Sequence, residues 1–135
     1  MLEVQITPMS GALVHGLHHI QMAIPPGKEV EARKFYRDLL GLTEVPVPAN
    51  LTHLGSFWFE RGEFRVHLGI DKDFHPARKA HPAFLVEGLD LLVQRLQAAG
   101  VTIVSADPVV GFNRCHIFDP FGNRIELMEP TSGGK

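Results

Sequence analysis

Four polar side chains with metal-binding chemistry lie on strand-like segments that are otherwise apolar. They are His19 in LHHIQMAI, His67 in FRVHLGI, His81 in HPAFLV and Glu126 in NRIELME. Side chains alternate between the two faces of a strand, so each of the four points away from its apolar neighbours. Imidazoles and a carboxylate turned into a shared interior are costly unless they are paired or ligated. This donor set suits Fe, Mn, Co, Ni or Zn and predicts a divalent metal site.

Each of these residues is also compatible with an ordinary structural role. His81 fits the exposed, polar start of a strand beside Pro82. Glu126 fits a solvated position paired with Arg124, and His67 fits the outer face of an amphipathic strand. Polar residues of this kind are more often exposed than buried. The prediction of a metal site therefore depends on the four residues occurring together.

The elements that carry these residues form an internal repeat. Apolar residues spaced as on one face of a helix predict helices near residues 28–40 and 88–99. Each helix follows one predicted strand and precedes three strand-like segments, with turns such as DPFGN between them. The order β-α-β-β-β thus occurs twice, in modules 17–70 and 79–129. Two similar modules predict packing about a pseudo-twofold axis.

The repeat predicts which positions are equivalent. Matching the first strands pairs His19 with His81, and matching the last strands pairs His67 with Glu126. The intervals are similar, with 48 residues from His19 to His67 and 45 from His81 to Glu126. The symmetry therefore predicts that all four side chains face one interior.

Composition narrows the function classes. The chain has 135 residues, of which 44% are hydrophobic and 21% charged, and this size suits one domain over residues 1–135. A net charge of −2 without a basic stripe argues against a nucleic-acid partner. No apolar run approaches the length of a membrane span, which argues against a membrane partner. Cys115 is the only cysteine, so a cytoplasmic location is expected.

Several stretches resemble the vicinal oxygen chelate superfamily, which groups glyoxalase I, extradiol dioxygenases, fosfomycin-modifying enzymes and bleomycin-resistance proteins. The matching stretches are LHHIQMAI, ARKFYRDLLGL, HPAFLV and DPFGNRIELME. The resemblance implies an α+β fold in which paired βαβββ modules form a cupped mixed sheet with a divalent metal in the cup. It also implies a homodimer, in which the two histidine ligands of one site can come from different chains.

The resemblance also implies roles for particular residues. His19, His81 and Glu126 match the family's metal ligands. His67 stands where glyoxalase I has a fourth ligand, a glutamate, so it is either a ligand or a base beside the metal. His116 stands where fosfomycin-modifying enzymes place a tyrosine beside the substrate. We therefore expect Glu126, His67 and His116 to be catalytic.

A small-molecule substrate follows from this site, with Arg114, Trp58 and Gln21 as expected binding residues. The superfamily chelates substrates through two neighbouring oxygens, and the metal acts as a Lewis acid. The leading prediction is a glyoxalase-like lyase or isomerase. The alternatives are an extradiol-type dioxygenase, which would need Fe(II), and a non-catalytic protein that sequesters its ligand as bleomycin-resistance proteins do.

Overall fold

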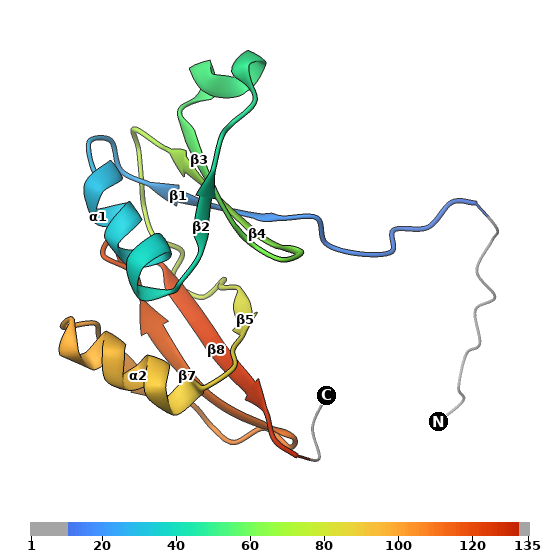
Figure 1. Ribbon diagram of the computed structural model, residues 1–135, viewed down its shortest axis with the longest axis vertical. Coiled ribbons are helices and arrows are strands. Elements are labelled where there is room, and N and C mark those ends of the chain that lie inside the picture. The colour runs from blue at the N-terminus through green and yellow to red at the C-terminus, as the bar shows by residue number, and fades with distance from the viewer. Residues whose placement is uncertain (1–10, 133–135) are drawn as a thin grey trace.

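Residues 11–132 are described in this computed structural model, and they form two four-stranded sheets, with the helix that follows the first strand of each sheet on one side (Figure 1). The domain expected over residues 1–135 includes residues 1–10 and 133–135, which lie outside the described residues. The first module contains β1 (Ile20–Ile24), α1 (Glu29–Arg33), η1 (Lys34–Leu39), β2 (Thr43–Val45), η2 (Ala49–Leu54), β3 (Ser56–Arg61) and β4 (Phe64–Ile70). The second contains β5 (Ala83–Leu85), α2 (Leu89–Ala98), β6 (Ile103–Ser105), β7 (Phe112–Phe118) and β8 (Arg124–Pro130).

Both sheets have the same topology. The strand order is β1-β4-β3-β2 in the first sheet and β5-β8-β7-β6 in the second. In each sheet the first strand runs parallel to the last, and the other neighbours are antiparallel. The predicted α+β fold of paired βαβββ modules is confirmed.

Both predicted helices are present, and one of them departs from regular α geometry. The predicted helix 28–40 is observed as α1 followed directly by η1, and the predicted helix 88–99 as α2. The η1 segment is a π-helix, in which the amide of Leu40 donates to the carbonyl of Phe35 at 2.9 Å. Both helices lead into a glycine with positive φ, Gly41 and Gly100. None of the helices within residues 11–132 has the length and apolar character needed to cross a bilayer.

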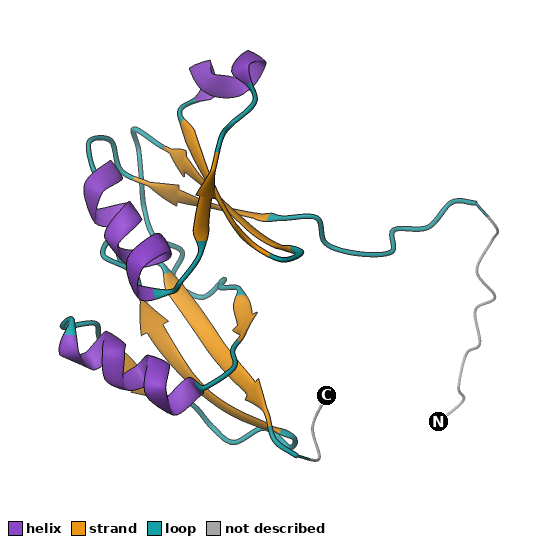
Figure 2. Ribbon diagram, viewed as in Figure 1, coloured by secondary structure: helices purple, strands orange, loops and turns teal. Residues whose placement is uncertain are grey.

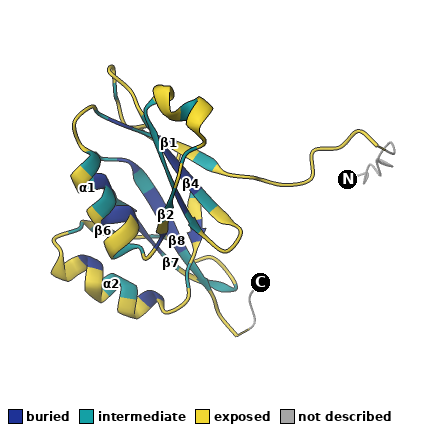
Figure 3. Ribbon diagram, turned by 45° about the horizontal axis from the view of Figure 1, so that its top comes forward, coloured by how far each residue is buried: buried dark blue, intermediate teal, exposed yellow. Residues whose placement is uncertain are grey.

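The apolar core lies between the helices and the sheet faces that they cover (Figure 2). Buried segments run along the strands and the inner sides of the helices, whereas the outer sides are exposed (Figure 3). The fully buried side chains include Phe35 and Tyr36 of η1, Leu96 of α2 and Ile125 of β8. Since alternate residues of a strand face opposite ways, the polar residues between these core positions point to the uncovered sheet face.

A buried polar network ties the two modules together. The Tyr36 hydroxyl donates to Asp119 Oδ2 at 2.8 Å. The Asn123 side-chain amide donates to the same oxygen at 2.8 Å and to the carbonyl of Ala23 at 2.9 Å. Burial raises the pKa of Asp119, although the hydrogen bonds that Asp119 accepts from Asn123 and Tyr36 by themselves lower it. The predicted DPFGN turn contains Asp119 and Asn123, so it also connects the second module to the first through hydrogen bonds.

Candidate metal centre

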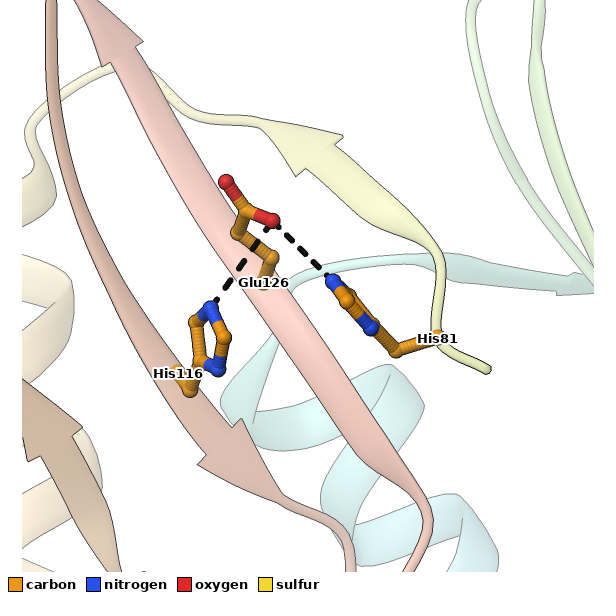
Figure 4. Close-up of side chains that lie close together, drawn as sticks. All are labelled: His81, His116 and Glu126. Atoms are coloured by element: carbon orange, nitrogen blue, oxygen red, sulfur yellow. Dashed lines mark hydrogen bonds and ion pairs between the residues drawn. The ribbon is translucent and has the colours of Figure 1, made fainter. Parts of the chain in front are cut away.

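Three potential metal ligands meet on the uncovered face of the second sheet, as Figure 4 shows. Glu126 in β8 pairs in register with Ala83 of β5 and with His116 of β7. His81 precedes Ala83 by two residues, which places it on the same face. The Nε2 atoms of His81 and His116 lie 3.1 and 3.8 Å from Glu126 Oε1. Within residues 11–132 this is the one group of three or more such residues, with ligand atoms within 4.8 Å of one another.

The contact between His81 and Glu126 has the chemistry of a metal site. His81 Nδ1 lies 2.8 Å from the carbonyl oxygen of Lys79, so Nδ1 carries a hydrogen and donates it. In the neutral ring, Nε2 then holds a lone pair and faces the carboxylate oxygen at 3.1 Å. Two acceptors at this distance repel each other unless a proton or a cation lies between them. The carbonyl that fixes the ring of His81 is the kind of partner that metal-ligating histidines use, so the residues fit a divalent cation.

Arg114 supplies the second contact of the Glu126 carboxylate. Its Nη1 donates to Glu126 Oε2 at 3.1 Å, and its Nε donates to the carbonyl of Asp107 at 2.8 Å. Burial by itself raises the pKa of Glu126, but the contacts with His81 and Arg114 outweigh it, so the pKa lies below its ordinary value. Glu126 is therefore ionised and available as a ligand at neutral pH.

Arg124 contacts His116 and is not the partner of Glu126. Its Nε donates to His116 Nδ1 at 2.8 Å. Arg114 contacts the Glu126 carboxylate instead. The interpretation of Glu126 as a residue paired with Arg124 is therefore wrong. His116 is buried, and burial followed by the charge of Arg124 lowers its pKa. Its ring is therefore neutral near pH 7.

The other predicted site residues gather on the first sheet. The ring of His67 in β4 is stacked between those of His19 and Trp58, with centroid separations of 4.1 Å on each side. The ring planes differ by 18° for His19 and by 3° for Trp58. His67 is only 4% exposed, and its Nε2 has no hydrogen-bond partner among residues 11–132. Burial, and then the neighbouring His19, lower the pKa of His67, so this ring is also neutral near pH 7.

These rings form one wall of a groove of about 720 Å³. Gln21 lines the same groove, and its side-chain amide lies across Gly69 of the neighbouring strand. A Cβ atom on Gly69 would lie 2.7 Å from Gln21 Nε2, so the missing side chain makes room for the amide. The groove thus combines an aromatic wall, imidazole nitrogens and an amide.

The strand register confirms the equivalence of His67 and Glu126. In the first sheet, Gln21, His67 and Trp58 form one cross-strand row. In the second sheet, Ala83, Glu126 and His116 form the corresponding row. His19 and His81 each precede the first member of their row by two residues. The register also makes Trp58 the counterpart of His116, a relation that spacing along the chain had not indicated.

One chain therefore presents the predicted site in two halves. His81, Glu126, His116 and Arg114 lie together on the second sheet. His19, His67, Trp58 and Gln21 lie together on the first. Neither His19 nor His67 belongs to the group of potential ligands around Glu126. The expected convergence of His19 with His81 and Glu126 does not occur within one described chain.

Comparisons with known proteins agree with this architecture. The family model of the Glyoxalase/Bleomycin resistance protein/Dioxygenase superfamily matches residues 16–127. A glyoxalase family protein from Bacillus anthracis is 39% identical, with a TM-score of 0.83 over 89% of this chain and 98% of its own. The fosfomycin resistance protein FosX from Listeria monocytogenes is 17% identical, with a TM-score of 0.70 over 89% and 97% of the two chains.

A mutant of the same FosX was solved with Mn(II) and 1S,2S-dihydroxypropylphosphonic acid. It is 17% identical, with a TM-score of 0.72 over 89% of this chain and 95% of its own. No curated protein matches the chain. At this identity the two FosX structures show a shared fold alone.

Proposed function

Because the chain belongs to the Glyoxalase/Bleomycin resistance protein/Dioxygenase superfamily, we propose that it is a divalent-metal-dependent lyase or isomerase of the glyoxalase type. Its substrate is a small molecule with two neighbouring oxygens. The observation that carries the proposal is the 3.1 Å contact between His81 Nε2 and Glu126 Oε1. The backbone carbonyl fixes the His81 ring, so its Nε2 and the carboxylate oxygen are held side by side where both can bind one cation.

The proposed ligands are His81 and Glu126 of one chain and His19 of a second copy. A divalent cation bound there supplies Lewis-acid polarisation of the substrate oxygens. Mn(II) is the first metal to test because it is present in a structure of similar fold, followed by Fe, Zn, Ni and Co. Arg114 lies beside Glu126 and, with Trp58 and Gln21 in the groove, would contact the substrate.

His67 has two candidate roles. Its buried Nε2 has no partner within residues 11–132, so the atom is available to a metal or to a substrate proton. We favour coordination or close approach to the metal, with general-base catalysis as the second role. The variant His67→Ala separates them, since loss of a ligand lowers metal affinity, whereas loss of a base lowers turnover with metal retained. If neither quantity changes, His67 is a strand residue only.

A homodimer would bring the two halves of the site together. His19 is exposed at the start of an edge strand, and β5, which follows His81, is the edge strand of the other sheet. Leu85 in β5 is 74% exposed, and Leu17, two residues before His19, is 82% exposed. These exposed apolar side chains lie next to the two halves of the site, and a second copy of the chain could bury them. A symmetric dimer is the commonest small assembly.

Mixing two inactive variants tests this assembly. The variants His19→Ala and Glu126→Ala are prepared separately and then allowed to exchange subunits. In a mixed dimer, one site carries both substitutions and the other carries neither. With random exchange, about a quarter of the wild-type number of Mn(II) sites should return, as counted by electron paramagnetic resonance. If the mixture binds no more Mn(II) than its parents, each site uses residues of one chain only.

Metal analysis and reconstitution test the function itself. Protein purified without chelator should contain a divalent metal, and His81→Ala or Glu126→Gln should abolish stoichiometric Mn(II) binding while the fold is retained. His53→Ala, which changes an exposed histidine of η2, is the matched control. Unchanged Mn(II) binding by both site variants would overturn the proposal. Oxygen consumption by the Fe(II)-loaded protein with a catechol would favour the dioxygenase instead, and ligand binding without turnover would favour sequestration.

A further inference from the structure

The groove on the first sheet has an apolar end beside its imidazoles. Leu51 and Leu54 of η2 line this end, and Leu54 is 62% exposed. η2 is a 3₁₀ helix, in which residues three apart share one face, so both leucines are turned towards the groove. The helix lies between β2 and β3 and is the green coil at the top of Figure 1. The groove therefore offers apolar surface that a ligand can remove from water.

The floor of the apolar end consists of small side chains. Next to the cross-strand row that contains His67, on the same face of the sheet, lies a row made of Ala23, Gly69 and Ser56. All three members of this small-residue row line the groove. The side-chain amide of Gln21 lies across Gly69, so the floor carries one polar group among small side chains.

The second module is filled at the equivalent positions. There the row that corresponds to the small-residue row consists of Leu85, Met128 and Arg114. The connection that corresponds to η2, residues 106–111 between β6 and β7, contains no helix. The pseudo-symmetry thus fails one row beyond the potential ligands. Because only the first module has the hollow, the hollow is not a consequence of the repeated fold.

An unpartnered polar atom adjoins the same groove. His67 lines the groove and is 4% exposed, and its Nε2 has no hydrogen-bond partner among residues 11–132. Buried polar groups are nearly always hydrogen-bonded in proteins, so an unpaired one beside a groove points to a ligand. The volume of about 720 Å³ lies within the range of roughly 300–1,000 Å³ that small-molecule sites occupy.

We propose that the apolar end of the groove binds an apolar substituent of the substrate, and that Leu51, Leu54 and the small-residue row determine the size of that substituent. This inference rests on the proposed function and names the substrate class more narrowly. The substrate presents two neighbouring oxygens to the metal and an alkyl or aryl group to η2. The order of the groups in the ligand then matches the order of the two ends of the groove.

The dependence of affinity on alkyl chain length tests this proposal. Hydroxamates chelate Mn(II) through two neighbouring oxygens, and acetohydroxamate, butyrohydroxamate and hexanohydroxamate differ only in their alkyl chains. Each added methylene should raise the affinity for the Mn(II)-loaded protein by about three- to fourfold. Leu54→Ser removes a side chain that borders the hollow, and Ala23→Leu fills its floor with the residue type that the second module has at the equivalent position. In both variants the gain should fall below about twofold per methylene.

Leu91→Ser is the matched control. Leu91 belongs to α2, is 68% exposed and lies outside this groove. The gain per methylene in this variant should equal that of the wild-type protein.

Trp58 provides a second readout that needs no metal. It is the only tryptophan in the chain, and it lines the groove. Butanol, hexanol and octanol lack a chelating group, so their effect on the fluorescence of Trp58 in the metal-free protein reports on the apolar end alone. Octanol should reach its half-maximal effect at a concentration about tenfold lower than hexanol. In Ala23→Leu that difference should disappear.

The outcomes separate this inference from the proposed function. Affinities that do not rise with chain length in the wild-type protein, or that rise equally in Leu54→Ser and Ala23→Leu, would overturn the inference. Weaker self-association of Leu54→Ser in sedimentation, with the chain-length dependence retained, would also overturn it, because a second copy then covers this leucine. If instead His81→Ala and Glu126→Gln keep their Mn(II), the proposed metal site fails, whereas the alcohols still test the apolar end in the metal-free protein.

Discussion

Removing the Tyr36 hydroxyl should weaken the connection between the modules, and by more at neutral than at acidic pH. In Tyr36→Phe the ring keeps its place in the core, while Asp119 Oδ2 loses a donor at 2.8 Å. Asp119 retains the amides of Phe121 and Asn123 on Oδ1 and the Asn123 side chain on Oδ2. A hydrogen bond to a charged group contributes about 2 kcal/mol, so the free energy of unfolding should fall by about that amount at neutral pH.

The pH dependence follows from the pKa of Asp119. Burial raises this pKa in the folded protein, so the folded state binds more protons than the unfolded state between the unfolded and folded pKa values. Stability therefore decreases as pH rises through that window. The Tyr36 hydrogen bond lowers the pKa of Asp119, so its removal extends the window upwards. At acidic pH below the folded pKa of Asp119, where the carboxyl is protonated, the loss should be only about 1 kcal/mol, as for a neutral hydrogen bond.

Urea denaturation at a single protein concentration measures this difference. With a slope of about 2 kcal/mol per molar urea, the midpoint should fall by about 1 M at neutral pH and by about half of that at acidic pH below the folded pKa of Asp119. Asp38→Asn, which changes an exposed carboxylate of the same helix, should leave the midpoint almost unchanged. Equal losses for Tyr36→Phe at both pH values would refute the assignment of Asp119 as the titrating partner.

Three further perturbations test other contacts. Gly69→Ala should leave the stability of the protein unchanged or slightly raised. The new Cβ should displace Gln21 Nε2 by about 0.7 Å, from 2.7 Å to an ordinary contact of 3.4 Å. The side-chain amide resonance of Gln21 should therefore shift, and an unmoved resonance would contradict the close approach. Burial raises the pKa of the Cys115 thiol, so a thiol reagent should modify it slowly until urea unfolds the chain, and rapid modification of the native protein would contradict this. Arg33 binds Glu44 through two hydrogen bonds of 2.8 and 3.2 Å, and because both side chains are about one-third exposed, Arg33→Met should cost no more than about 1 kcal/mol in thermal or urea denaturation.

The sequence was sufficient to predict the repeat and the equivalence of His67 with Glu126. Both depend on periodicity and on backbone register, which alternating apolar residues determine directly. The partners of the two arginines were not predictable in the same way. Arg114 and Arg124 lie on adjacent strands, and which of them reaches Glu126 depends on side-chain conformation. Spacing also could not place His19, since symmetry makes two positions equivalent without bringing them together in one chain.

The π-helical turn in η1 bears on how the two repeats differ in length. From the first helical residue to the terminating glycine there are 12 steps in the first module, Glu29 to Gly41, and 11 in the second, Leu89 to Gly100. One extra residue in an α-helix would rotate every later side chain by about 100°. A wider turn accommodates that residue locally, as the π-helical segment η1 does. The helix can therefore vary in length by a residue while the strands on either side, and the side chains that they carry, keep their registration.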